Sequence, residues 1–291
     1  MASASLHALL SGLIDYAGLF PPAGLPLDEV VHNYGTYRRS KVNWALGRLV
    51  VPAARLRQLV SLLQASGNRW PVTALVGEDL VADVASIAAV SNSADIVVES
   101  AEVRATTVAQ VNAAVSALAG VRDVYVELPP NVDLPSLLTA VSDAGARAKI
   151  RTGAIVADGI PSAADVARFL EVCAAKSLPF KATAGLHHPL RGDYPLTYAA
   201  DAPRGHMFGF LNVFAGAAYA RAGMRGEVLE QLLAESGARN FHFSHTGLTW
   251  RGASLSIDDL LDARTSFAMS FGSCSFREPI DELIQLGLLS P

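Results

Sequence analysis

The chain has 291 residues, of which 51% are hydrophobic and 17% are charged, and its formal net charge at pH 7 is −4. Its basic residues are scattered along the chain, which excludes the clustered positive charge typical of proteins that bind nucleic acids or anionic membranes. We therefore expect a small-molecule partner, with no nucleic acid and no membrane.

The cysteines and the apolar stretches indicate a cytoplasmic protein. Cys173 and Cys274 form neither a disulfide framework nor a metal-binding pair, as is usual in a reducing compartment. The apolar stretch 9–20 follows no positive segment and is interrupted by Asp15, so we expect no export signal. No stretch reaches the ~20 apolar residues of a membrane-spanning helix. The sequence leaves open whether copies of the chain form a homo-oligomer.

Strand-like and helix-like segments alternate along the chain. Short apolar or β-branched runs predict strands at 13–20, 47–51, 71–76, 95–99, 123–128, 148–152, 179–184 and 240–245. Apolar residues at helical spacing predict helices at 26–40, 53–66, 80–90, 106–118, 134–144, 162–175, 209–222 and 256–267. Eight such cycles are most simply closed as a TIM-type (β/α)8 barrel, an α/β fold in which residues 1–291 form a single domain.

An open doubly wound sheet would show the same alternation, but no G-x-G-x-x-G motif or P-loop opens any predicted helix.

Two features extend the predicted barrel. The connection 186–207 is long enough to indicate a lid, and its tyrosines, prolines and histidines favour an ordered one. Residues 277–288 predict an extra C-terminal helix that starts from a turn at 272–275. In this turn we expect Cys274 to be an ordinary turn residue, since it lacks the spacing of a nucleophile elbow.

Polar residues occur late in nearly every predicted strand. In a TIM barrel such positions surround the substrate pocket. The set comprises Asp15, Thr73, Glu99, Glu127, Lys149, Arg151, Lys181, Thr183, His242 and His245. Lys149 and Arg151 are two residues apart and therefore share one face of their strand, as do Lys181 and Thr183. We expect the charged members to converge on one side of the barrel mouth, as a functional pocket or, alternatively, as a structural ion-pair network.

Lys181 is the predicted nucleophile. We expect its pKa to be lowered by burial and by the neighbouring cations Lys149 and Arg151. Glu127 or Glu99 would then transfer protons, and His187 or His188 would contribute from the lid. The predicted substrate-binding residues are Lys149, Arg151, Thr183, Asp15, Asn212 and His245. Arginine in particular suits a carboxylate, because its guanidinium binds in a bidentate manner.

The run Lys181-Ala182-Thr183-Ala184-Gly185 resembles the K-[TA]-[ST]-[TA]-G strand around the Schiff-base lysine of class I (β/α)8 aldolases of the deoxyribose-phosphate aldolase type. The resemblance implies a lyase that makes or breaks a carbon–carbon bond in a carbonyl substrate without a cofactor, with Lys181 forming the imine. That family has a second lysine in a Lys-Ala-Ser-Gly-Gly strand, which this sequence lacks. Lys149, on the preceding strand, is the hypothetical substitute.

A divalent metal, Zn, Mn or Fe, is the alternative to the imine. Histidines and carboxylates are normal ligands for these ions. The candidate ligands are His187, His206, His242, His245, Glu99 and Glu127, and the protein would then be a metal-dependent hydrolase or isomerase. His187 and His188 are not expected to bind one ion together, because adjacent residues of an extended chain point in opposite directions. A non-catalytic barrel that binds a small molecule is a second alternative.

Overall fold

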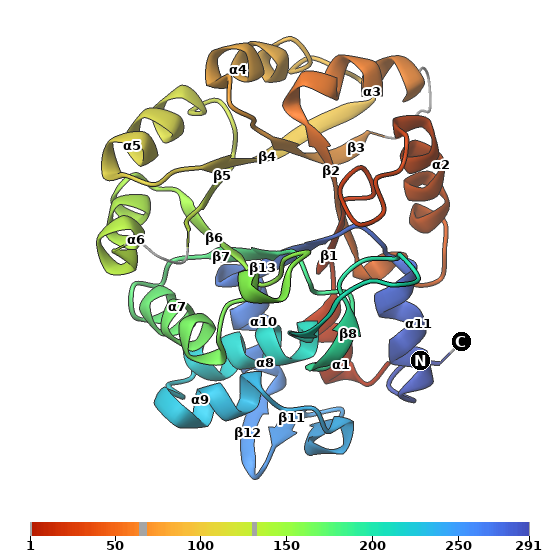
Figure 1. Ribbon diagram of the computed structural model, residues 1–291, viewed down its shortest axis with the longest axis vertical. Coiled ribbons are helices and arrows are strands. Elements are labelled where there is room, and N and C mark those ends of the chain that lie inside the picture. The colour runs from red at the N-terminus through yellow and green to blue at the C-terminus, as the bar shows by residue number, and fades with distance from the viewer. Residues whose placement is uncertain (1, 64–68, 130–132, 291) are drawn as a thin grey trace.

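The computed structural model describes residues 2–63, 69–129 and 133–290. Eight parallel strands close into a barrel in the order β1-β13-β7-β6-β5-β4-β3-β2 (Figure 1). Their bounds are β1 Ile14–Tyr16, β2 Leu46–Pro52, β3 Trp70–Leu75, β4 Ile96–Arg104, β5 Asp123–Glu127, β6 Arg147–Arg151, β7 Phe180–Thr183 and β13 Ala268–Ser273. The predicted (β/α)8 barrel is therefore confirmed.

Helices cover the outside of the barrel (Figure 1). They are α1 Ala4–Leu10, α2 Leu27–Arg38, α3 Leu56–Leu63, α4 Leu80–Ala88, α5 Val108–Ala117, α6 Leu134–Asp143, α7 Ala163–Ala175, α8 Phe210–Arg221, α9 Gly226–Leu233, α10 Ile257–Ser266 and α11 Arg277–Gln285. Short 3₁₀ turns in the described ranges accompany them, namely η1 Asn43–Ala45, η2 Ala53–Arg55, η3 Ala157–Gly159 and η4 Ala238–Asn240. The predicted end of the helix at 53–66 lies outside the described residues.

Helix α7 shows how local sequence produces these elements. It begins at a capping box in which Ser162 and Asp165 each accept a hydrogen bond from the other's backbone amide. Val166, Phe169 and Cys173 then recur at helical spacing, and all three are buried against the barrel. Capping and amphipathic spacing therefore specify both the start of this helix and the face that it buries.

The predicted eighth strand was wrong. Phe241–Phe243 forms β10, which pairs with β11 (Gly247–Trp250), and β11 pairs with β12 (Ala253–Ser256), in an antiparallel sheet separate from the barrel. This sheet packs beside α1 and α10. The barrel closes through β13, between β1 and β7. Because β13 reads Ala-Met-Ser-Phe-Gly-Ser, with no β-branched residue, strand propensity does not identify it.

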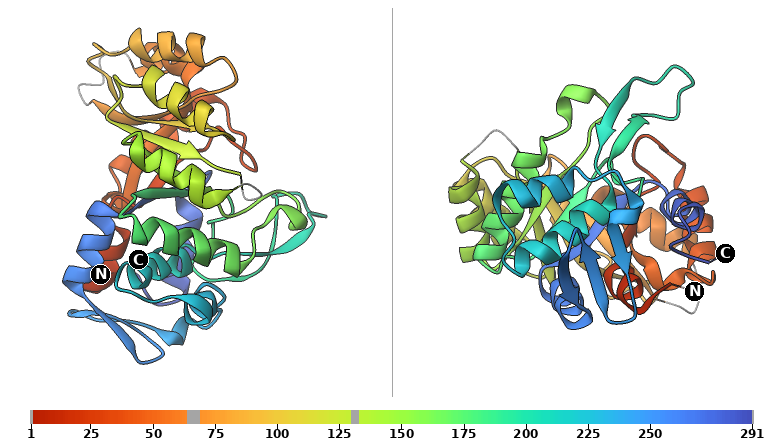
Figure 2. Two further views of the ribbon diagram at one scale, coloured as in Figure 1. Left: turned by 90° about the vertical axis from the view of Figure 1, so that its left-hand side faces the viewer. Right: turned by 90° about the horizontal axis from the view of Figure 1, so that it is seen from below.

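The long connection after β7 is an antiparallel hairpin of β8 (Gly192–Pro195) and β9 (Arg204–Met207). Figure 2 shows this hairpin projecting from the body of the molecule. The extra C-terminal helix is confirmed as α11, and two histidine–glutamate contacts join it to the segment that leads into the hairpin. His187 Nδ1 lies 3.1 Å from Glu278 Oε2, and His188 Nδ1 lies 2.6 Å from Glu282 Oε1. Within the described ranges no helix has the length and apolar character needed to cross a membrane.

Candidate active site

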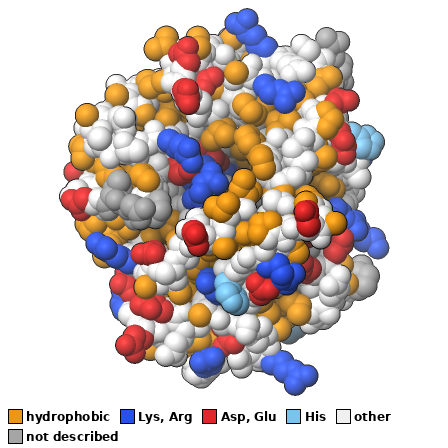
Figure 3. Space-filling model, viewed as in Figure 1, with side chains coloured by type: hydrophobic (Ala, Val, Ile, Leu, Met, Phe, Trp, Pro, Cys, Tyr) orange, Lys and Arg blue, Asp and Glu red, His pale blue; other side chains and the backbone are white. Residues whose placement is uncertain are grey.

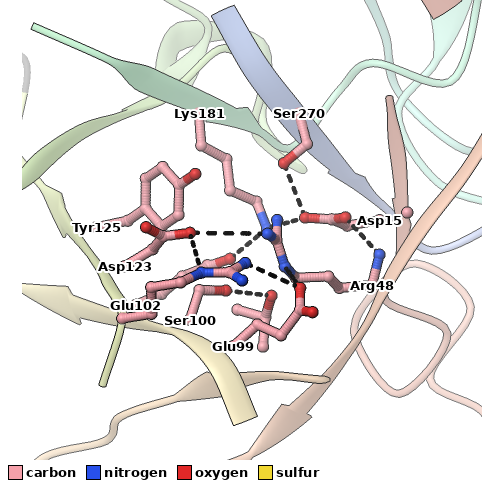
Figure 4. A network of polar contacts seen from close by, with 12 residues as sticks. Asp15, Arg48, Glu99, Ser100, Glu102, Asp123, Tyr125, Lys181 and Ser270 are labelled. Carbon is pink, nitrogen blue, oxygen red and sulfur yellow. Dashed lines mark hydrogen bonds and ion pairs between the residues drawn. The ribbon is translucent and has the colours of Figure 1, made fainter. Parts of the chain in front are cut away.

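Two lysines on neighbouring strands organise an ion-pair network inside the barrel. Lys181 Nζ, on β7, lies 2.5 Å from Asp15 Oδ2 and 2.5 Å from Glu102 Oε1 (Figure 4). Lys149 stands opposite Lys181 in the parallel pairing of β6 with β7, and its Nζ lies 2.6 Å from both Glu102 Oε2 and Glu127 Oε2. Glu102 therefore bridges the two ammonium groups. All five side chains are buried, and burial of charge is tolerated only with such close partners.

Asp15 is an ion-pair partner of Lys181 and has a structural role. Its Oδ2 also accepts a hydrogen bond of 2.8 Å from Ser270 Oγ, and its Oδ1 accepts one of 2.7 Å from the backbone amide of Arg48 (Figure 4). The side chain is fully buried. The predicted placement of Asp15 as a substrate contact at the mouth is therefore not what the structure shows, because both carboxylate oxygens are already engaged inside the barrel.

Lys181, Glu102 and Glu127 are ionised near neutral pH. Burial acts to lower the pKa of Lys181, but Asp15 and Glu102 outweigh it and raise that pKa above its ordinary value. The expected lowering by neighbouring cations therefore does not occur. Burial also acts to raise the pKa of Glu102 and that of Glu127. Lys149 and Lys181 nevertheless lower the pKa of Glu102 to about 2. Lys149 and Arg151 lower the pKa of Glu127 to about 2.

A cavity of about 960 Å³ opens at the C-terminal ends of the strands, within the size range of small-molecule sites. Figure 3 shows a hollow on this face, where basic and acidic side chains lie beside hydrophobic ones. The ionisable and hydroxyl side chains that line the cavity are Glu78, Glu102, Arg104, Glu127, Lys149, Arg151, Thr183, His187 and Cys274. Neither Lys181 nor Asp15 lines it, so Lys149 is the barrel lysine that faces the cavity.

Two arginines stand at the rim of this cavity. Arg104 Nε lies 2.9 Å and Arg151 Nε 3.4 Å from Glu127 Oε1. Their side chains are 75% and 44% exposed, so much of each guanidinium surface remains available to a ligand. Arg151 occupies its predicted place, whereas the sequence interpretation missed Arg104. The rim therefore presents two fixed positive charges beside Lys149.

Glu99 is not at the mouth, and its prediction as a catalytic residue or metal ligand there was wrong. Strand β4 continues five residues beyond it, and a register shift between β3 and β4 leaves Glu99 as an extra residue between Val98 and Ser100. Its carboxylate pairs with Arg48, near the start of β2, and with Arg122, just before β5. These partners place Glu99 toward the N-terminal end of the barrel.

Asn212 was also predicted as a substrate contact, and the structure contradicts this. Helix α8 is buried from Phe210 to Ala220. Asn212 Oδ1 accepts a hydrogen bond from the backbone amide of Arg191, and its Nδ2 donates to the carbonyls of Leu232 and Glu235. The amide side chain is therefore used entirely to join three segments outside the cavity.

The histidines named as candidate ligands for the alternative metal site are dispersed. His242 lies on β10 and His206 on β9, both exposed, and His245 lines a surface depression beside α1. His187 lines the main cavity, while His188 lines a smaller one next to it. These positions do not support the alternative metal site or the assignment of His245 to substrate binding.

One group of three potential ligands lies close together in the described part of the chain, namely His188, Glu278 and Glu282, whose ligand atoms fall within 4.8 Å of one another. His188 is already paired with Glu282, and Glu278 with His187. We interpret these contacts as links between the segment that follows β7 and α11.

Glu102 is the central site residue that the sequence interpretation missed. The predicted strand ended at Glu99, whereas β4 continues through Ser100-Ala101-Glu102-Val103 to Arg104. One available signal was Thr107, which caps helix α5 and so leaves room for a longer strand. Cys274, which the sequence interpretation took for an ordinary turn residue, directly follows β13 and lines the cavity.

These observations define a (β/α)8 barrel with a charged cavity at its C-terminal mouth. No family model matches the chain, and no curated protein sequence matches it. Among solved structures, it is similar to a deoxyribose phosphate aldolase from Aeropyrum pernix, a structure described as a unique tetramer. The identity is 16%, the TM-score is 0.48, and the alignment covers 63% of this chain and 80% of the other. At these values the likeness supports no conclusion about function or assembly.

Proposed function

We propose that this protein is an enzyme of the aldolase type that forms an imine between a barrel lysine and a small carbonyl substrate. One observation carries the proposal: Lys149 faces the cavity between Glu102 and Glu127, with Lys181 at the same level on the adjacent strand. A lysine that faces a cavity between two carboxylates has groups within reach that can exchange its protons.

We assign the imine to Lys149 rather than to Lys181. The sequence resemblance places the Schiff base on Lys181, but that amine is engaged by Asp15 and Glu102 below the cavity. In the proposed reaction the Lys149 ammonium transfers a proton to Glu127, a transient step that is unfavourable at equilibrium because the pKa of Glu127 is lowered, and the free amine so formed attacks the carbonyl carbon. The carbinolamine then loses water to give the imine, and Glu127 returns its proton to the departing hydroxyl.

The two arginines at the rim of the cavity indicate the class of substrate. Arg104 and Arg151 both approach one carboxylate oxygen of Glu127 and keep much of their surface exposed. A carboxylate or phosphate on the substrate would therefore meet two guanidinium groups close to the reactive amine, where charge-assisted hydrogen bonds are strong. We infer a small carbonyl compound with an anionic group, such as a 2-oxo acid or a phosphorylated ketone.

Borohydride trapping tests the proposal. The protein is incubated with a panel of small 2-oxo acids and phosphorylated ketones, reduced with borohydride and mapped by peptide mass spectrometry. Mapping is direct because the chain has four lysines, Lys41, Lys149, Lys176 and Lys181. We expect a stoichiometric adduct on Lys149 that the Lys149→Met variant loses.

The matched control is Lys176→Met, which removes an exposed lysine at the end of α7 and should leave the adduct intact. An adduct on Lys181 would keep imine chemistry and overturn the assignment to Lys149. If no compound in the panel gave an adduct on either lysine, the imine reaction would be rejected, and Lys149 would be left as an anion-binding charge.

A further inference from the structure

A second group of reactive side chains surrounds Cys274 on the wall of the same cavity. Cys274 directly follows β13, is buried and lines the cavity. Its Sγ lies 4.0 Å from His187 Nδ1 and 3.6 Å from the Tyr198 hydroxyl oxygen. Glu278 Oε2 fixes both neighbours, at 3.1 Å from His187 Nδ1 and 3.0 Å from the Tyr198 hydroxyl. Two residues of the connection between β7 and α8 thus contact the sulfur, and a carboxylate of α11 holds both of them.

The charges around this sulfur favour a thiolate. Burial opposes ionisation of Cys274, but the neighbouring His187, followed by Tyr198 and the backbone amide of Ala23, lower its pKa overall. Burial also opposes the charged form of His187, yet Cys274 and Glu278 raise the pKa of His187 to about 9. The imidazole is therefore protonated near neutral pH, next to the sulfur.

The other titratable groups that face the pair do not remove this effect. Burial raises the pKa of Tyr16 to about 12 and also raises that of Tyr198, so both phenols stay neutral. The ring of His188 lies 6.4 Å from that of His187, between centroids, and contacts Glu282 rather than the sulfur. Cys173 provides an internal contrast, because it is fully buried in the core face of α7 and burial raises its pKa.

We propose that Cys274 is a second nucleophile of the cavity, paired with His187, and that it adds reversibly to small aldehyde-bearing ligands. The thiolate electron pair forms a bond to the aldehyde carbon, and the carbonyl π electrons move to oxygen. That oxygen takes a proton from the His187 imidazolium, which leaves a neutral hemithioacetal and a neutral imidazole. An aldehyde fits because this addition requires only a nucleophile and a proton donor, with no leaving group and no oxidant.

Alkylation kinetics test the thiolate. Full-length protein is treated with iodoacetamide between pH 5 and pH 9.5, and the two cysteine peptides are followed by mass spectrometry. We expect Cys274 to be alkylated at least tenfold faster than Cys173, with a midpoint below the value of about 8.5 for an ordinary thiol. The variant His187→Gln should shift that midpoint upward by at least one pH unit, and Tyr198→Phe should shift it less. Alkylation of Cys274 no faster than of Cys173, or an unchanged midpoint in His187→Gln, would overturn the proposal.

Protection experiments test the ligand class. They use the Lys149→Met variant, so that no imine can form at position 149. Glycolaldehyde is the probe, and glycerol, which lacks the carbonyl, is the control compound. We expect glycolaldehyde to slow alkylation of Cys274 severalfold and glycerol to leave it unchanged. Equal rates with both compounds would refute the aldehyde ligand. The two proposals can fail separately, because labelling of Cys274 does not depend on Lys149 and trapping on Lys149 does not depend on Cys274.

Discussion

Glu102 is the carboxylate shared by both buried lysines, and the variant Glu102→Gln tests whether the network stabilises the fold. The change keeps the size of the side chain and removes its charge, so that Lys181 retains Asp15 and Lys149 retains Glu127. The pKa of Glu102 falls from its ordinary value of 4.5 to about 2 in the folded protein. A difference of that size corresponds to about 3 kcal/mol of stability. Removal of one partner from a buried ion pair typically costs ~3–5 kcal/mol, which agrees in magnitude.

The assay is urea unfolding followed by far-ultraviolet circular dichroism, and the control is Glu227→Gln, which alters an exposed glutamate at the start of α9. At pH 7 we expect Glu102→Gln to lose about 3 kcal/mol in the free energy of unfolding, and the control to change by less than ~0.5 kcal/mol. Because the folded pKa of Glu102 is depressed, its contribution is present above pH 4.5 and is lost as the pH falls toward 2. The difference between the wild-type protein and Glu102→Gln should therefore shrink below pH 4.5.

Two outcomes would refute this reasoning. A loss below ~1 kcal/mol at pH 7 would mean that desolvation of the charges cancels their attraction, as happens in some buried ion pairs. A difference that stayed constant between pH 7 and pH 3.5 would mean that the glutamate acts through packing rather than through its charge.

Two further predictions concern the surroundings of the site. Asn212→Ala removes the partner of the Arg191 backbone amide and of the Glu235 carbonyl, at ~1–3 kcal/mol for each unsatisfied group, and one of the hydrogen bonds to the Leu232 carbonyl. It should lower the melting temperature far more than the exposed-site control Asn112→Ala, while trapping on Lys149 persists. Equal melting temperatures for the two variants would contradict the structural role. Because the pKa of His187 is raised in the folded protein, its ion pair with Glu278 stabilises the fold below pH 6.5. This stabilisation is lost as the pH rises through about 9. Glu278→Gln should therefore cost about 1 kcal/mol at pH 6 and nothing at pH 10, a modest value because this carboxylate is partly exposed. A cost that is the same at both pH values would argue against the ion pair.

The sequence by itself determined the alternation of strands and helices and the faces that those elements bury. Helix α7 illustrates the reason, since its capping box and its apolar spacing lie within one short segment. The two-residue period of strands was also sufficient to place Lys149 and Arg151 on one face of β6, and both line the cavity. Such local signals require no knowledge of how distant segments pair.

Only the tertiary structure decided which strand closes the barrel and how deep each charged group lies. Strand β13 is stabilised by burial between β1 and β7, which its own composition does not reveal. The register of β4 decides that Glu102 reaches the lysines while Glu99 lies toward the opposite end. Lys149 and Lys181 stand opposite each other across two strands, yet only Lys149 faces the cavity, because Asp15 holds Lys181 below it. The depth of each charged side chain and the closure of the barrel depend on pairing between strands that are far apart in the chain. Secondary-structure propensity and hydrophobic periodicity, in contrast, depend only on residues that are close together in the sequence.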